Sequence, residues 1–151
     1  MKFDLVHYIN WDVVLDEGNW YSGSHIGFYS AIFHHTQAIA EYCTDDYQGT
    51  DAMIFIFAPP DPDVPAKLIL LSDSYGSCSY CDAWGEADEA TARELAENLA
   101  RNVNMFDTLE ELREFLEVDV KNEAGYYSYR EVASGLLKNL DEFIEEQNED
   151  K

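Results

Sequence analysis

The sequence predicts a small α+β protein in which a small antiparallel sheet is packed by about four helices. Two apolar runs, residues 52–58 and 66–72, flank a proline-rich stretch, and this order is typical of a hairpin. Several other stretches repeat apolar residues every three or four positions, as amphipathic helices do. The length of 151 residues suits one domain, so we expect a single acidic domain over residues 1–151.

The N-terminal third contains the least regular pattern. Residues 3–15 mix alternation with apolar runs and fit either a strand or a helix. After a turn rich in Gly and Ser, we expect Ser24 to cap a helix that runs to about Cys43. The apolar stripe of this helix would contain Ile32, Thr36, Ile39, Ala40 and Cys43.

The hairpin is the centre of the predicted sheet. Both runs are apolar on successive residues, which indicates strands that are covered on both faces or close to it. The linker, residues 59–65, contains all four prolines, and proline lacks the N–H that a strand would donate to its neighbour. We therefore expect a loop there.

Three helices are predicted after the hairpin. The first begins near Asp88, and its inward stripe contains Ala92, Leu95, Ala96, Leu99 and Val103. Thr108 and Glu111 form a capping box that opens the second helix, and Ser128 with Glu131 opens the third. The third helix should bury Val132, Leu136, Leu140, Phe143 and Ile144, while residues 145–151 fray because they place negative charge at the wrong end of the helix dipole.

The large negative net charge is the most unusual feature of the composition. The chain has 31 Asp and Glu against nine Lys and Arg, a formal net charge of −22, and the acids are spread along its whole length. Such a field repels nucleic acid and anionic lipid and favours basic partners. Solubility alone requires a net charge of only about 2–8 in a small domain. No stretch approaches the roughly 18 apolar residues of a membrane span, and the first residues do not resemble a signal peptide, so we expect a cytoplasmic protein.

The acids of the predicted helices form rows. Carboxylates three or four positions apart on a helix stand about 6 Å from one another, similar to neighbouring phosphates of one nucleic-acid strand. The candidate partner-binding residues are Glu89, Glu94 and Glu97 on the first helix, Glu110, Glu111, Glu114 and Glu117 on the second, and Asp141, Glu142 and Glu145 on the third. We predict an inhibitor that imitates nucleic-acid charge and blocks a basic, nucleic-acid-binding host protein. Ordinary solvated helix faces, or the general acidity of a halophile, are the alternatives.

Cys78 and Cys81 are the sharpest local motif. Two thiolates at this spacing can bind one zinc ion or cycle as a dithiol, so a thiol- or zinc-dependent protein is an alternative function. A structural zinc site needs four ligands, however, and the sequence has no second Cys pair. We therefore expect a tight loop with inward-packed thiols, and no metal or cofactor. A structural or assembly protein of a virus is a third reading.

Histidines are the other candidates for chemistry. All four lie in the first 35 residues. We expect His35 to be packed and His34 to be exposed to solvent, and a histidine could serve as a general base. The sequence contains no P-loop, dinucleotide-binding glycine motif, zinc-protease motif or calcium loop. We therefore predict a binding protein and not an enzyme.

Two short motifs flank the hairpin. Tyr47-Gln48-Gly49 precedes it, and Tyr75-Gly76-Ser77-Cys78-Ser79-Tyr80-Cys81-Asp82 follows it. Together they resemble a family of uncharacterised small proteins from phages and bacteria, over roughly residues 47–117. The resemblance implies a phage or mobile-element origin and no particular chemistry. By charge alone, the chain is also similar to anti-restriction and anti-CRISPR mimics of nucleic acid.

Overall fold

A four-stranded antiparallel sheet forms the centre of the protein, in the order β1-β2-β3-β4. The computed structural model describes residues 4–20, 24–44, 49–75, 84–121 and 130–149. The strands are β1 (Thr36–Cys43), β2 (Gly49–Phe57), β3 (Lys67–Tyr75) and β4 (Asn104–Phe106). The predicted α+β class and the antiparallel sheet are confirmed.

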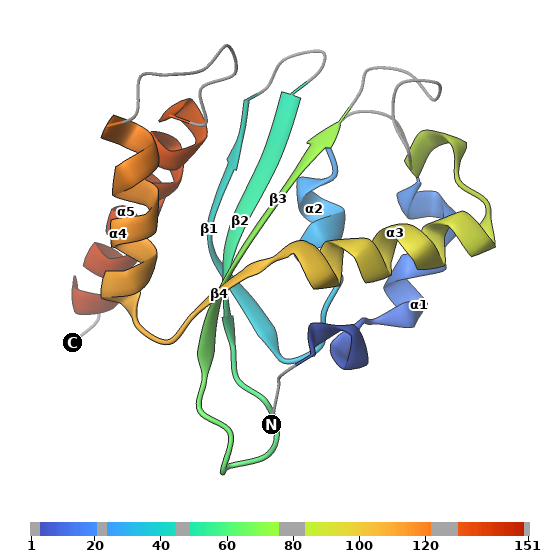
Figure 1. Cartoon of the computed structure of the whole chain (residues 1–151), viewed down its shortest axis with the longest axis horizontal. Coiled ribbons are helices and arrows are strands. Elements are labelled where there is room, and N and C mark those ends of the chain that lie inside the picture. Colours follow the sequence, from blue (N-terminus) through green and yellow to red (C-terminus); the bar gives the residue numbers. More distant parts are fainter. Residues whose placement is uncertain (1–3, 21–23, 45–48, 76–83, 122–129, 150–151) are drawn as a thin grey trace.

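Helical segments precede and follow the strands (Figure 1). The short segments η1 (Leu5–Tyr8), α1 (Trp11–Val14), η2 (Glu17–Asn19) and α2 (Ile26–Tyr29) come before β1. Next along the chain, η3 (Trp84–Glu86) and α3 (Glu89–Asn102) connect β3 to β4, and α4 (Leu109–Lys121) and α5 (Arg130–Glu149) follow β4. Residues 4–15 thus form two short helical pieces, which answers the choice between strand and helix that the sequence leaves open.

The central hairpin is buried on both faces, as its continuous apolar runs predict. Met53 and Phe55 alternate with Ala52 and Ile54 along β2, and all four side chains are buried. The odd-numbered pair packs against the N-terminal segments and α3, in what we call the first core. The even-numbered pair packs against α4 and α5, in the second core. Each fully buried large apolar side chain contributes about 1.5–3 kcal/mol, so the hairpin holds the two layers together.

The pairing of β2 with β3 is regular from end to end. Gly49 lies opposite Tyr75 at one end of the ladder, and Phe57 lies opposite Lys67 at the other; Asp51 lies opposite Asp73, two pairs in from the first end. Residues 58–66 connect the two strands outside the ladder and include every proline, which confirms the predicted loop.

The predicted helix from Ser24 to about Cys43 is wrong. Helix α2 ends at Tyr29, and β1 occupies the second half of that range. His35 has a φ of 63°, in the left-handed region, so a right-handed helix cannot pass through it. Pairing with β2 then outweighs the local helical pattern, because strand formation depends on neighbours that are distant in sequence.

A bulge explains why the helical interpretation was attractive. Ala38 pairs with Phe55 and Ala40 with Ile54, so Ile39 is the extra residue of β1. A bulge breaks the strict alternation of a strand. Ile39 and Ala40 are consequently both buried in the second core, and two successive inward residues also suit a helix.

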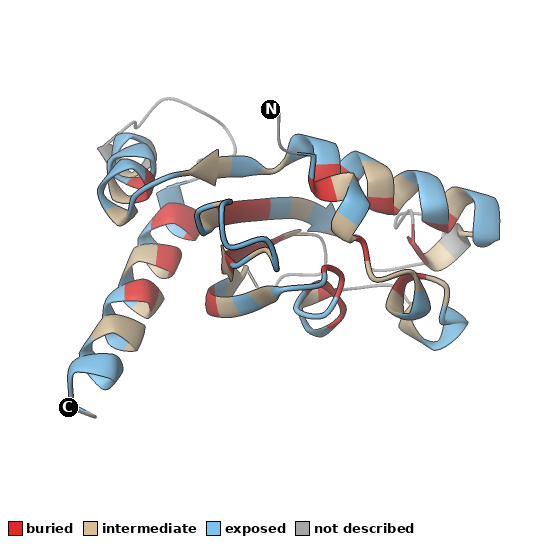
Figure 2. Cartoon of the chain, turned by 90° about the horizontal axis from the view of Figure 1, so that it is seen from below, coloured by how far each residue is buried: buried red, intermediate tan, exposed pale blue. Residues whose placement is uncertain are grey.

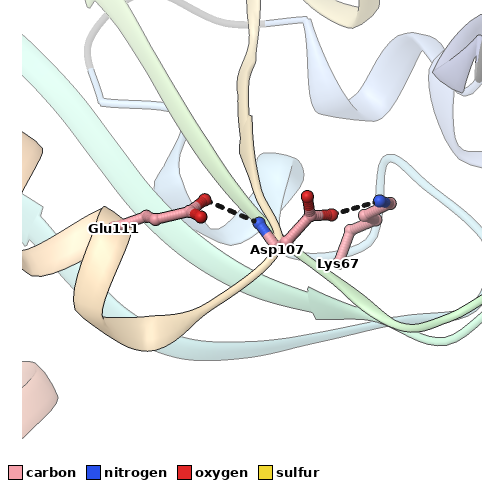
Figure 3. A network of polar contacts seen from close by, with 3 residues as sticks. All are labelled: Lys67, Asp107 and Glu111. Carbon is pink, nitrogen blue, oxygen red and sulfur yellow. Dashed lines mark hydrogen bonds and ion pairs between the residues drawn. The ribbon is translucent and has the colours of Figure 1, made fainter.

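The three long helices are confirmed, with one change at a cap. The Asp88 carboxylate accepts a hydrogen bond from the Thr91 N–H at 2.8 Å and opens α3. The Thr108 hydroxyl accepts from the Glu111 N–H at 3.2 Å, as a capping box requires. The Glu111 carboxylate, however, accepts from the N–H of Asp107, one residue earlier than expected, while Lys67 forms an ion pair with Asp107 (Figure 3).

The last helix matches its predicted inward face. Val132, Leu136 and Leu140 are buried, and Phe143 and Ile144 are half-buried against the same core. The proposed Ser128 cap lies outside the described residues. Helix α5 continues to Glu149, and the expected fraying of residues 145–151 stays a prediction.

Candidate functional site

The acidic helices lie on two different faces of the sheet. Helix α3 packs on the first core, whereas α4 and α5 pack on the second core, so the sheet separates them (Figure 1). Glu89, Glu94 and Glu97 are therefore apart from the other predicted site residues. The structure brings together the α4 and α5 residues, which are Glu110, Glu111, Glu114, Glu117, Asp141, Glu142 and Glu145.

Burial decides which side of each helix faces solvent. Leu112 and Leu116 of α4 and Leu136 and Leu140 of α5 are buried, so the opposite sides of both helices point outward (Figure 2). Of the ten predicted site residues, Glu97 is half-buried and the other nine are exposed.

Arginines neutralise part of the acidity. On α3, Arg93 pairs with Glu89 at 3.2 Å and Arg101 pairs with Glu97 at 3.5 Å. Such exposed pairs contribute about 0–1 kcal/mol to stability, but they cancel charge locally. Helix α3 has three acidic and two basic residues, so it carries little excess charge.

The α4–α5 layer keeps a large negative excess. The two helices together carry eleven acidic and four basic residues. Arg113 of α4 forms an ion pair with Asp141 of α5 and links the two helices. We call five of the exposed acids of this layer, Glu110, Glu114, Glu117, Glu142 and Glu145, the α4–α5 acidic face. A shallow hollow of about 510 Å³ lies on it beside Arg113 and Val118.

A groove runs between α5 and the outer edge of the sheet. Its volume is about 440 Å³. We call it the β1–α5 groove, and its lining residues are Ala38, Ile39, Ala40 and Glu41 of β1 with Asn139, Glu142, Phe143 and Glu146 of α5. The sequence interpretation missed this site because it placed β1 inside a helix. The acids of α5 were visible, but the strand beside them was not.

A buried polar cluster lies where β2 begins and β3 ends. Asp51 is fully buried and accepts two hydrogen bonds, from the Ser24 hydroxyl and from the backbone N–H of His25, each at 2.6 Å. These bonds fasten the start of α2 to β2. Ser24 is thus an anchor and not the cap of a long helix.

Tyr29 and Asp73 form the other half of this cluster. The Tyr29 hydroxyl donates to Asp73 at 2.7 Å and accepts from the Trp84 indole N–H at 3.1 Å. Burial, and next the Asp73 charge, raise the pKa of Tyr29 well above its ordinary value. The hydroxyl therefore stays protonated and serves as a fixed donor. A cavity of about 130 Å³ borders Asp73 and Trp84. The sequence signal for this cluster is one Asp at the polar end of each of the two apolar strands.

The sequence also singles out two cysteines and two neighbouring histidines as candidates. Cys78 and Cys81 lie outside the described residues, so the thiol or zinc alternative stays a prediction. His34 and His35 are both exposed, with ring centroids 6.2 Å apart, so the expected packing of His35 is wrong. The left-handed turn at His35, in place of a helix, is the reason. Within the described residues, no group of three His, Cys, Asp or Glu side chains is placed to hold a metal ion.

Among the described ranges, no helix combines the length and the apolar character that crossing a bilayer requires. No protein-family model, no curated protein and no solved structure matches this chain.

Proposed function

We propose that this protein is an acidic inhibitor that binds a basic, nucleic-acid-binding protein and occupies its nucleic-acid channel. The target would be a host defence protein, and a phage or mobile element would encode the inhibitor. The protein itself binds no nucleic acid, because its charge repels phosphate. The observation that carries the proposal is the α4–α5 acidic face, where two neighbouring helices expose carboxylates with a large excess over cations.

The spacing on this face supports charge imitation. Glu110, Glu114 and Glu117 follow one another at four and three positions, so their carboxylates lie about 6 Å apart along α4. Packed helices lie about 8–10 Å apart, which sets a second row of acids on α5 beside the first. The buried leucines beneath both helices hold the rows in place. Rigid rows suffer less loss of conformational freedom on binding than a flexible acidic tail would.

The proposal favours α4 and α5 over α3. Arg93 and Arg101 pair with two of the three α3 acids, and α3 faces away from the other rows. The proposed binding surface therefore excludes α3, and α3 serves as an internal control.

Affinity capture from a host lysate tests the proposal. The unmodified protein should retain a basic nucleic-acid-binding protein, and duplex DNA should displace it by competing for the same channel. Raising salt from roughly 50 to 200 mM should weaken capture by orders of magnitude, as it does for protein–DNA complexes.

Two charge variants locate the surface. One carries Glu→Gln changes at Glu110, Glu114 and Glu117 of α4, and the matched control carries three such changes on α3, at Glu89, Glu94 and Glu97. The first should lose capture and the second should keep it. Capture that survives the first variant, or that DNA and salt do not affect, would contradict the proposed function.

A further inference from the structure

The outer edge of β1 is open along the β1–α5 groove. In the sheet order β1 is a terminal strand, and no described strand pairs with its outer side. Edge strands of this kind can template pairing with another chain. The edge has a bulge at Ile39, and helix α5 lies beside it with the groove between the two.

One hydrogen bond shows which backbone groups face the groove. The Asn139 side-chain amide of α5 donates to the carbonyl oxygen of Glu41 at 2.7 Å, so this carbonyl points away from β2. In an antiparallel ladder, the N–H and C=O of one residue point to the same side. The N–H of Glu41 therefore also faces outward, where an added strand would accept from it.

Charge determines what can occupy the groove. Glu142 and Glu146 of α5 supply its carboxylates, and the described lining contains no Lys or Arg. Glu41 lines the groove with its backbone, because it pairs with Met53, whose side chain lies in the first core on the opposite face of the sheet. A second copy of this chain, with its own net charge of −22, would be repelled. A cationic strand would be attracted. Phe143 supplies an apolar contact for the aliphatic stem of a Lys or Arg whose charged end reaches the carboxylates.

We infer that the β1–α5 groove binds an extended, Lys- or Arg-bearing segment of a partner protein, which adds to β1 as a further strand. Side chains alternate along a strand, so every second residue of the segment faces α5, and those are the basic ones. The inference goes beyond the proposed function, because it needs no nucleic-acid channel in the partner.

Two synthetic peptides test the inference on the unmodified protein. One alternates Lys and Thr, and the other alternates Lys and Pro, so that charge is kept while strand pairing is lost. The Lys–Thr peptide should bind at least about tenfold more tightly in calorimetry, because several backbone hydrogen bonds are at stake. Its addition should also protect the Glu41 N–H from hydrogen exchange. Equal affinities for the two peptides, or an unprotected Glu41 N–H, would overturn strand addition.

Substitutions at Glu41 separate charge from backbone pairing. Glu41→Gln and Glu41→Pro both remove the carboxylate, but only Glu41→Pro removes the outward N–H. We expect Glu41→Pro to bind the Lys–Thr peptide about fivefold more weakly than Glu41→Gln. Circular dichroism checks the fold of both variants, and the exchange measurement on unmodified protein does not depend on either.

Controls on α5 and α4 localise the peptide. Glu146→Gln removes a groove carboxylate and should weaken binding two- to fivefold, about the strength of one surface ion pair. Glu149→Gln, on the same helix but outside the groove lining, should change nothing. Glu110→Gln with Glu114→Gln, which belongs to the proposed inhibitor face, should also leave peptide affinity unchanged. A concentration-dependent dimer that Glu41→Pro abolishes would assign the edge to a second copy and reject the partner segment.

Discussion

Asp51 and Asp73 lie directly opposite each other on β2 and β3, and each accepts a hydrogen bond from a residue in or beside α2. Adjacent carboxylates normally repel, so their placement requires donors that hold the charge. Ser24 and His25 donate to Asp51, and Tyr29 donates to Asp73. A pair of strand residues thus fastens a short helix that has few residues to stabilise it alone.

Asp51→Ala should be strongly destabilising, by about 2–5 kcal/mol in urea unfolding. It leaves the buried His25 N–H and the Ser24 hydroxyl without their charged acceptor. Asp51→Asn should cost clearly less, because its oxygen can serve His25 while the Ser24 hydroxyl reverses to accept from the amide. Equal costs for the two variants would mean that Asp51 does not act through these bonds.

Tyr29→Phe should destabilise the protein by about 1–3 kcal/mol. The change removes the donor to Asp73 and the acceptor for the Trp84 indole at a fully buried site. Ser30→Ala is the matched control, since its hydroxyl donates to Gly27 at the exposed side of the same segment, and it should change stability by less than about 0.5 kcal/mol. Chemical unfolding measures both.

The raised pKa of Tyr29 predicts a loss of stability in alkali. The folded state keeps the Tyr29 proton at pH values where the unfolded state, near its ordinary pKa of 10.0, loses it. The contribution is complete below pH 10 and declines by about 1.4 kcal/mol per pH unit from there towards the folded pKa. The stability difference between unmodified protein and Tyr29→Phe should therefore shrink above pH 10. A constant difference would refute the assigned shift.

Two glycines in helices should respond oppositely to alanine. A Cβ at Gly135 of α5 would clash with the Tyr42 ring of β1, whereas a Cβ at Gly27 of α2 would meet nothing within 4 Å. Gly135→Ala should cost about 1–3 kcal/mol through overpacking, despite the better helix propensity of Ala. Gly27→Ala should stabilise by about 0.5–1 kcal/mol. Thermal unfolding of both variants would test the close packing of α5 on β1.

Arg113→Gln should improve the proposed inhibitor. It removes the cation that pairs with Asp141, which raises the negative charge of the α4–α5 layer and costs only about 0–1 kcal/mol of stability. Capture of the basic target should become tighter and more sensitive to salt. Arg93→Gln, which breaks an equivalent pair on α3, should leave capture unchanged. A similar gain from both variants would show that net charge matters and the surface does not.

Several elements followed from local pattern. The apolar runs of β2 and β3, the prolines between them, and the stripes of α3, α4 and α5 each contain their own signal over a few residues. The acidity of the outer helix faces was equally visible. The helical pattern of residues 24–43 misled, because a bulge at Ile39 imitates it and because the edge strand owes its existence to β2.

The sequence by itself determined the class of the fold, the sign and size of the charge, and the helices that carry it. Those properties depend on composition and on neighbours within a few positions. The tertiary structure decided that α3 stands apart from α4 and α5, that Asp51 is buried beside α2, and that Glu41 borders a groove with Glu146. Each of these relationships is between residues far apart in the chain. The favourable free energy of burying both sheet faces sets them, and local preference does not.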